Sequence, residues 1–338
     1  MFNLTQREQP IDQHNMLNIL DRFYEQCHYA LSLAANIHIK NPVKQVVIAG
    51  MGGSATAGDI VNCYLKGILP FYFPRSYELP RWVSKDTLVF VISYSGNTEE
   101  TLCMYEEAKR RGCSIVVISS GGKLKDKALR EQVPHIEVPS GLPPREATGY
   151  QALPMLIVLE NSGLIPKNKD FTNVVGILKT DYKVQAKDIA KRLVNRTPLI
   201  YSSEAMYCIA RIWKIKMNEN AKIQAFCNVI PEMNHTEIEG FNKVLTDYFV
   251  LMLEDEEDDT RIKRRMEITK EILQEKGLPV LIIKITGKNR LARILSSLLL
   301  AGYVSYYLAL SYNTDPFPFP TIEAFKKRLE GEKRIATR

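Results

Sequence analysis

The chain has 338 residues, enough for two domains, and its 45% apolar and 25% charged residues are typical of a globular protein in water. The net charge of +7 is modest, and no basic stretch is interleaved with aromatic residues, which argues against nucleic-acid binding. Six cysteines without a C-x-x-C pair, and a polar N-terminus without a signal peptide, lead us to expect a reduced, cytoplasmic protein.

The first half of the chain has the pattern of an α/β unit. Residues 1–40 carry apolar side chains at helical spacing. From there to about residue 150, short β-branched runs alternate with amphipathic stretches, which predicts parallel strands joined by right-handed helical crossovers. The predicted strands are residues 44–50, 86–93, 113–122 and 133–139, and the predicted helices are residues 54–67, 98–112 and 123–132.

The second half repeats this architecture without a close sequence repeat. A proline-rich loop at 139–146 leads into a helix at 147–163, which we expect to pack back on the first unit. After a helical linker at 166–195 the alternation restarts. The predicted strands are residues 197–203, 243–255 and 277–285, and the predicted helices are residues 204–226, 260–277 and 322–331. We therefore predict two tandem α/β domains, residues 1–165 and 166–338, each a doubly wound, mainly parallel sheet flanked by helices.

Two stretches allow more than one interpretation. Residues 294–312 carry no charge and approach the length of a membrane span, but serines and tyrosines in the middle of the run favour a buried core helix. The acidic run EDEEDD, residues 254–259, could bind a divalent cation, although a solvated turn before a basic helix explains it more simply.

Two loops that follow predicted strands combine glycines with hydroxyls: AGMGGSATAG at 49–58 and VISYSGNTEETL at 91–102. Both lie at the carboxyl ends of parallel strands, where open α/β sheets bind ligands. The glycines let backbone N–H groups approach an anion, the hydroxyls can donate, and a helix N-terminus adds free N–H groups. Several neutral donors of this kind can satisfy a phosphate monoester without Lys or Arg.

The alternatives for these loops are a dinucleotide site and simple helix capping. Gly50, Gly52 and Ala55 match the fingerprint G-x-G-x-x-A, but the following region offers no clear acidic residue for a ribose, and the second loop stays unexplained. Thr98 could be an N-cap, with the serines merely ending a strand. The two loops together favour a phosphate.

The same two loops resemble those with which sugar isomerase (SIS) domains bind phosphosugars. Three further stretches, PSGLPPREATGY, KMNENAK and PEMNHTEIEGF, are similar to one family within that fold, the bifunctional phosphoglucose/phosphomannose isomerases. The resemblance covers nearly the whole chain as two tandem SIS domains. It implies an aldose–ketose isomerase that converts glucose 6-phosphate, and mannose 6-phosphate as well, to fructose 6-phosphate through an enediol or enediolate. It also implies no metal or other cofactor, and phosphate contacts from Gly53, Ser54, Ser93, Ser95 and Thr98.

Glu219, in KMNENAK, is the candidate base that moves a proton between adjacent sugar carbons. Its predicted helix is apolar on more than one side, and a carboxylate in such surroundings can have its pKa raised toward the working pH. The alternative is a surface ion pair, because Lys216 and Lys222 lie three residues to either side. The resemblance implies that Glu219 is the base.

His235 follows Pro231 in a predicted loop. An imidazole titrates near neutrality and can pass a proton to or from the ring oxygen of a sugar. A metal site with Glu232, Glu237 and Glu239 is the alternative, but one histidine with adjacent acids lacks the usual ligand set. The resemblance implies a ring-opening histidine here, in a homodimer where His235 reaches the site of the neighbouring subunit.

Arg145 follows two prolines, and its forked, always charged guanidinium is suited to the oxygens of an enediolate. An exposed loop arginine is the alternative. The resemblance implies an active-site arginine in this motif, and also a lysine in the terminal helix that contacts the sugar. Lys326 is chosen over Lys327 because it follows Phe325 in the order apolar–Lys that the family shows.

The preferred sugar and a non-catalytic function stay open. Phe319 and Pro320 occupy a region where the family tends to place a small polar residue that helps to admit both epimers, with Thr321 as a substitute. The main functional alternative is a phosphosugar sensor, although the first 40 residues are too short and too weakly basic for a DNA-binding helix pair. A dinucleotide-dependent oxidoreductase rests on the glycine fingerprint alone.

Overall fold

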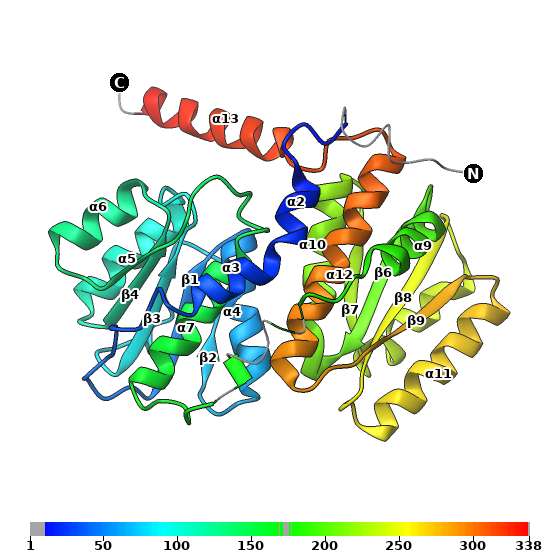
Figure 1. Cartoon of the computed structure of the whole chain (residues 1–338), viewed down its shortest axis with the longest axis horizontal. Coiled ribbons are helices and arrows are strands. Elements are labelled where there is room, and N and C mark those ends of the chain that lie inside the picture. Colours follow the sequence, from blue (N-terminus) through cyan, green and yellow to red (C-terminus); the bar gives the residue numbers. More distant parts are fainter. Residues whose placement is uncertain (1–10, 169, 172–175, 177, 337–338) are drawn as a thin grey trace.

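The computed structural model describes residues 11–168, 170–171, 176 and 178–336, which form two α/β units (Figure 1). The sheet of the first unit is parallel throughout, in the order β2-β1-β3-β4-β5. This order reverses its winding between β1 and β3, so the sheet is doubly wound as predicted. Its strands are β1 (Gln45–Gly50), β2 (Phe71–Tyr72), β3 (Thr87–Ile92), β4 (Ser114–Ser119) and β5 (His135–Glu137).

The second sheet has the same winding with one strand fewer, in the order β7-β6-β8-β9, and is also parallel. The fold class predicted from the alternation of elements is therefore confirmed. Its strands are β6 (Thr197–Ser203), β7 (Phe226–Ile230), β8 (Tyr248–Asp255) and β9 (Val280–Ile285).

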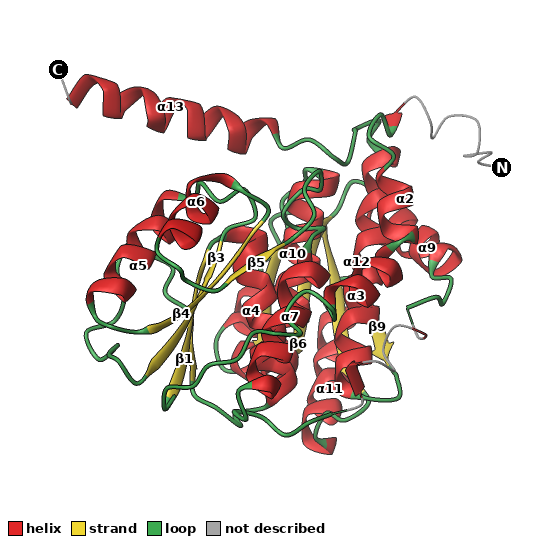
Figure 2. Cartoon of the chain, turned by 60° about the vertical axis from the view of Figure 1, so that its left-hand side comes forward, coloured by secondary structure: helices red, strands yellow, loops and turns green. Residues whose placement is uncertain are grey.

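Helices lie between the two sheets and on the outer face of each (Figure 1), and Figure 2 shows α5 and α6 on one side of the first sheet with α4 and α7 on the other. One apolar core, which includes alternate residues of β1 such as Val46 and Ile48, joins the facing sides of both sheets to α4, α7, α10 and α12. The remaining β1 residues, such as Val47, face α5 and α6, and α11 covers the outer face of the second sheet. The helices are α2 (Met16–Asp21), α3 (Phe23–Ala30), α4 (Gly52–Leu65), α5 (Glu99–Arg110), α6 (Gly122–Arg130), α7 (Thr148–Asn161), α9 (Lys183–Leu193), α10 (Tyr207–Lys216), α11 (Thr260–Glu275), α12 (Arg290–Ser311) and α13 (Pro320–Ala336).

The helix predicted over residues 204–226 is too long, and the strand that follows it was missed. The α-helix ends at Lys216, a π-helical turn (Met217–Ala221) follows, and Lys222 has a left-handed conformation with a φ of 57°. A left-handed residue stops a helix because the next N–H groups turn away from its axis. The chain is thereby free to enter β7 at Phe226.

The uncharged run forms α12, a helix of the core, as predicted. Within the described part of the chain it is the one helix long and apolar enough to span a membrane, and 94% of its apolar window is buried inside the protein. Two of its buried polar side chains pair with other helices: Trp213 Nε1 donates to Ser297 Oγ at 3.0 Å, and the Tyr303 hydroxyl donates to Asp21 at 2.7 Å.

The terminal helix α13 leaves the body of the molecule and lies beyond the loops at one end of the first sheet (Figure 1). Every side chain from Thr321 to Arg328 is exposed. In Phe325, 65% of the surface is accessible, which is unusual for a large apolar side chain on an amphipathic helix.

The acidic run of residues 254–259 surrounds Arg293 instead of a cation. The Arg293 guanidinium, with 1% of its side chain exposed, lies 2.8 Å from Asp255, 3.1 Å from Glu256 and 2.7 Å from Glu257. No cluster of side chains suited to a metal occurs in the described ranges. The solvated turn expected from the sequence is also wrong for Asp255, whose side chain is 1% exposed.

Substitution of Arg293 by methionine should lower the free energy of unfolding by about 3 to 5 kcal/mol, because it leaves the buried Asp255 carboxylate without its partner. Arg264→Met is the control, since the Arg264 side chain is 60% exposed and should contribute about 1 kcal/mol at most. Denaturant unfolding of both variants measures the difference. Equal small losses would show that the buried pair does not stabilise the second sheet.

Candidate active site

The two glycine- and hydroxyl-containing loops lie side by side in the folded chain. They follow β1 and β3, which are hydrogen-bonded neighbours with Gly50 opposite Ile92. The winding of the sheet reverses between these two strands, and ligands of open α/β sheets bind outside such a point. We call the cluster of Ser54, Ser93, Ser95 and Thr98 at this edge the hydroxyl corner.

The hydroxyl corner is held together by its own hydrogen bonds. Ser93 Oγ lies 2.9 Å from Thr98 Oγ1 and accepts the Thr98 N–H at 3.3 Å. Ser54 Oγ accepts the Tyr94 N–H at 3.2 Å, and Ser95 Oγ accepts the Asn97 N–H at 3.3 Å. Thr98 is the N-cap of α5 by position, but its side chain makes no capping hydrogen bond. Capping alone therefore does not explain the corner.

Gly96 makes the turn within this corner possible. Its φ is +69°, and a Cβ there would lie 1.8 Å from the carbonyl oxygen of Gly121. Only glycine is free of both the conformational strain and the clash. The turn packs the β3–α5 loop against the β4–α6 loop and exposes the Ser95 hydroxyl.

The loop that carries Arg145 is fastened to the hydroxyl corner. A Cβ on Gly53 would lie 2.7 Å from the backbone nitrogen of Arg145, so glycine allows the two backbones to touch. The Tyr94 hydroxyl donates to the Pro139 carbonyl at 2.8 Å and accepts the Leu142 N–H at 3.0 Å. Tyr94 was not predicted as part of the site, although an aromatic residue between two serines at a strand end is a signal for it.

Arg145 is a buried residue that reaches from the first unit to the second, and not an exposed loop arginine. It is 2% exposed, and its Nη2 donates to the carbonyls of Pro316 and Phe317 at 2.7 and 2.8 Å. The Phe319 ring lies 5.6 Å from the guanidinium carbon. Burial lowers the pKa of Arg145 and nearby carboxylates oppose this, so the group stays charged near neutrality.

Glu219 lies beside this guanidinium, with its Oε2 3.3 Å from Arg145 Nη1. Neither neighbouring lysine pairs with its carboxylate: Lys216 binds Glu146, and Lys222 Nζ binds the Asp315 carbonyl at 2.6 Å. The surface ion pair considered from the sequence is therefore absent. Burial and the Arg145 charge lower the pKa of Lys222 to about 8. In such a pair the carboxylate can remove a proton, and the neighbouring cation can stabilise the anion that results.

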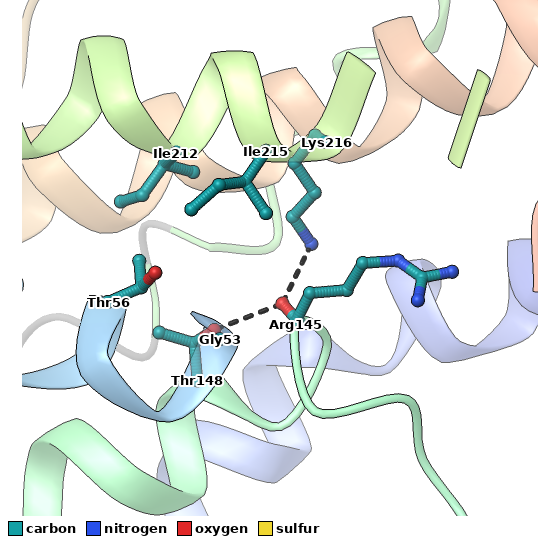
Figure 3. Close-up of a pocket in the computed structure, with 7 residues that line it drawn as sticks. All are labelled: Gly53, Thr56, Arg145, Thr148, Ile212, Ile215 and Lys216. Carbon is teal, nitrogen blue, oxygen red and sulfur yellow. Dashed lines mark hydrogen bonds between the residues drawn. The ribbon is translucent and has the colours of Figure 1, made fainter. Parts of the chain in front are cut away.

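The backbone of Arg145 borders a small cavity between α4 and α10 (Figure 3). The Arg145 carbonyl accepts hydrogen bonds from Lys216 Nζ at 3.1 Å and Thr148 Oγ1 at 3.0 Å, while the guanidinium points away from the cavity. The cavity has a volume of about 10 Å³ and holds one water at most, so it is too small to be a substrate pocket.

Within one chain, neither His235 nor Lys326 contacts the Glu219–Arg145 pair in the described structure. His235 follows a short 3-10 helix (Glu232–Asn234) at the carboxyl end of β7 and is exposed, with no side-chain partner among the described residues. Glu237 instead accepts from Tyr201 and from Asn228 at 2.6 Å, so the acids around His235 do not form a metal site. Lys326 is exposed on α13.

Comparison with known proteins identifies the family of the chain. Residues 41–130 match the SIS domain family, and residues 182–329 match the bacterial phospho-glucose isomerase C-terminal SIS domain. A bifunctional phosphoglucose/phosphomannose isomerase from Caldicellulosiruptor bescii is 39% identical over 90% of this chain and 96% of its own length. One from Aquifex aeolicus is 37% identical over 92% of this chain and 97% of its own length.

The chain belongs to the bifunctional phosphoglucose/phosphomannose isomerase family. It consists of two SIS domains, as the sequence motifs indicated. The C-terminal domain of glucosamine-fructose-6-phosphate aminotransferase from Francisella tularensis superimposes with a TM-score of 0.70, covering 90% of this chain and 98% of that domain. At 15% identity this similarity shows the shared fold alone.

In this isomerase family member, Gly53→Ala should separate the Arg145 loop from the hydroxyl corner, because the added methyl group meets backbone atoms on a packed surface. The free energy of unfolding should fall by about 1 to 3 kcal/mol. Gly240→Ala is the control, since a Cβ there meets nothing within 4 Å. Thermal or denaturant unfolding measures both, and an unchanged Gly53→Ala protein would contradict the close contact.

Proposed function

We propose that this protein interconverts glucose 6-phosphate and mannose 6-phosphate with fructose 6-phosphate through an enediolate. The observation that carries the proposal is the Glu219–Arg145 pair, with Oε2 and Nη1 3.3 Å apart. Arg145 belongs to a loop whose backbone packs against Gly53, next to the hydroxyl corner. The names of the relatives from Caldicellulosiruptor bescii and Aquifex aeolicus support the same substrates.

The hydroxyl corner and Gly53 anchor the phosphate of the substrate. Hydroxyl donors and the free N–H groups at the start of α5 suit a dianion, and the positive end of the helix adds to the attraction. The corner itself has no acid–base group. It therefore fixes the position of the sugar and leaves the bond changes to residues of the second domain and the Arg145 loop.

Glu219 is the base that carries a proton between C1 and C2 of the open-chain sugar. Arg145 stabilises the negative charge that develops on the two oxygens, because its orientation is set before the reaction begins. One Nη1 hydrogen of Arg145 has no partner in the described part of the chain, so it is available to donate to an enediolate oxygen.

His235 opens the sugar ring in the site of a second subunit, so the working form is a homodimer. The exposure of His235 and its lack of a side-chain partner among the described residues of its own chain support this assignment. Lys326 contacts the sugar from α13. Its exposure on a helix that leaves the body of the molecule supports a contact that forms only when substrate or the partner subunit binds. No metal or cofactor takes part in the proposed reaction.

Three further assignments complete the proposal. The boundary between the domains lies at residue 165, which is supported by family matches that fall on either side of it. Both glucose 6-phosphate and mannose 6-phosphate are substrates, although the region where the family tends to place a small polar residue has Phe319 against Arg145 and an exposed Thr321. The enzyme works in the cytoplasm, which its free cysteines support.

Glu219→Gln should lower kcat by about 100- to 10,000-fold, the range for loss of a general base, because the amide cannot accept the proton. The dissociation constant of a non-isomerisable analogue, sorbitol 6-phosphate, should stay within about threefold, since the hydroxyl corner is unchanged. Coupled assays with glucose 6-phosphate and mannose 6-phosphate and calorimetry measure the two effects. Full activity would remove Glu219 as the base, and inactivity of the unaltered protein on both sugars would favour a phosphosugar sensor.

Co-expression of Glu219→Gln chains with His235→Ala chains should restore activity, although each variant alone is inactive. Random pairing places both variants in half of the dimers, and each mixed dimer has one intact site, so about 25% of the activity should return. The assay is the same coupled isomerisation. If His235 serves the site of its own chain, co-expression restores nothing.

A further inference from the structure

Asn220, the neighbour of Glu219, is fully buried and lies at the centre of a polar network. Its Oδ1 accepts from Arg145 Nε, while its Nδ2 donates to Glu146 at 3.2 Å and to Ser305 at 3.0 Å. Arginine can only donate and a carboxylate can only accept, so the orientation of the Asn220 amide is determined by its partners.

Glu146 and Lys216 form a buried ion pair behind this amide, with side chains 3% and 2% exposed. Burial lowers the pKa of Lys216, and the Glu146 carboxylate opposes that shift. Lys216 Nζ also donates to the Arg145 carbonyl at 3.1 Å. The pair therefore holds the backbone of Arg145 directly and its side chain through Asn220. An ion pair of this kind is weak evidence for stability but can determine one arrangement of its neighbours.

Asn220 and Glu219 accept hydrogen bonds from two nitrogens of the same guanidinium: Asn220 from Nε and Glu219 from Nη1. Both residues lie in the π-helical turn Met217–Ala221, which follows the last residue of α10. The base and the contact that orients its cationic partner are thus adjacent in one rigid turn.

We propose that Asn220, held by the Glu146–Lys216 pair, is the positioning residue that aligns Arg145 with Glu219 for proton transfer. This inference rests on the proposed function. Asn220 itself touches no substrate. It acts by preventing the guanidinium from rotating about its bonds to the carbonyls of Pro316 and Phe317, so that the Nη1 donor stays beside the Glu219 carboxylate.

Asn220→Ala is the first test. The value of kcat should fall by about 10- to 100-fold, the scale expected when a catalytic group is misplaced by about 1 Å. The KM for glucose 6-phosphate should change by less than about threefold, because the hydroxyl corner is untouched. Ser297→Ala is the control: Ser297 is also buried on α12, it accepts from Trp213, and it lies outside the network. An equal fall in kcat for both variants, or a rise in KM alone, would overturn the inference.

The double variant Glu146→Gln/Lys216→Met removes both buried charges together, so neither is left unpaired. It should fold and still lose about tenfold in kcat, since Asn220 and the Arg145 carbonyl lose their charged partners. Wild-type kcat in this folded variant would remove the ion pair from the proposal.

A readout independent of turnover separates this inference from the proposed function. Phenylglyoxal modifies arginines, and peptide mapping follows the rate at Arg145, which is 2% exposed. The rate should rise severalfold in Asn220→Ala and stay unchanged in Ser297→Ala. If the unaltered protein isomerises neither sugar, the proposed function fails. If it is active but Asn220→Ala keeps both its kcat and its slow Arg145 modification, only the positioning role fails.

Discussion

The site depends on the confinement of one guanidinium between the two domains. Arg145 comes from a loop of the first domain, but its side chain bonds to the π-helical turn of the second domain and to two carbonyls of the segment before α13. A buried arginine needs acceptors for its donors, and here they come from two segments that are far apart in sequence. The same contacts that satisfy the buried charge also place it beside Glu219, while the backbone of Arg145 touches Gly53 next to the hydroxyl corner.

The two domains share a winding but use their carboxyl edges differently. In the first domain the corner offers neutral donors to an outside anion, with Ser93 and Thr98 paired to each other. At the corresponding edge of the second domain, Asp258 accepts from the Ser203 hydroxyl and from the Asp255 N–H at 2.9 Å. A carboxylate of the chain itself thus occupies the position of an anion there. In the described geometry, the edge of the first domain is therefore the one whose hydroxyls do not bind a carboxylate of the chain itself.

The sequence was most informative where a pattern is local. The alternation of elements predicted both sheets, and the mid-run serines and tyrosines correctly indicated that α12 is a core helix. The end of α10 and strand β7 were missed, because Lys222 in a left-handed conformation has no distinct sequence signal. The burial of Asp255 was missed as well, since its partner Arg293 lies 38 positions further along the chain.

The sequence by itself determined the fold class and the family, because strand periodicity, glycine turns and hydroxyl-rich loops are written in contiguous residues. It also marked Glu219 and Arg145 as candidates, 74 positions apart. Only the tertiary structure decided that these two meet, that Gly53 brings the Arg145 loop to the hydroxyl corner, and that Asn220 connects Arg145 to a buried ion pair. Such contacts follow from the packing of whole elements against each other. Every residue has a backbone carbonyl, so the sequence does not indicate that those of Pro316 and Phe317 accept from Arg145.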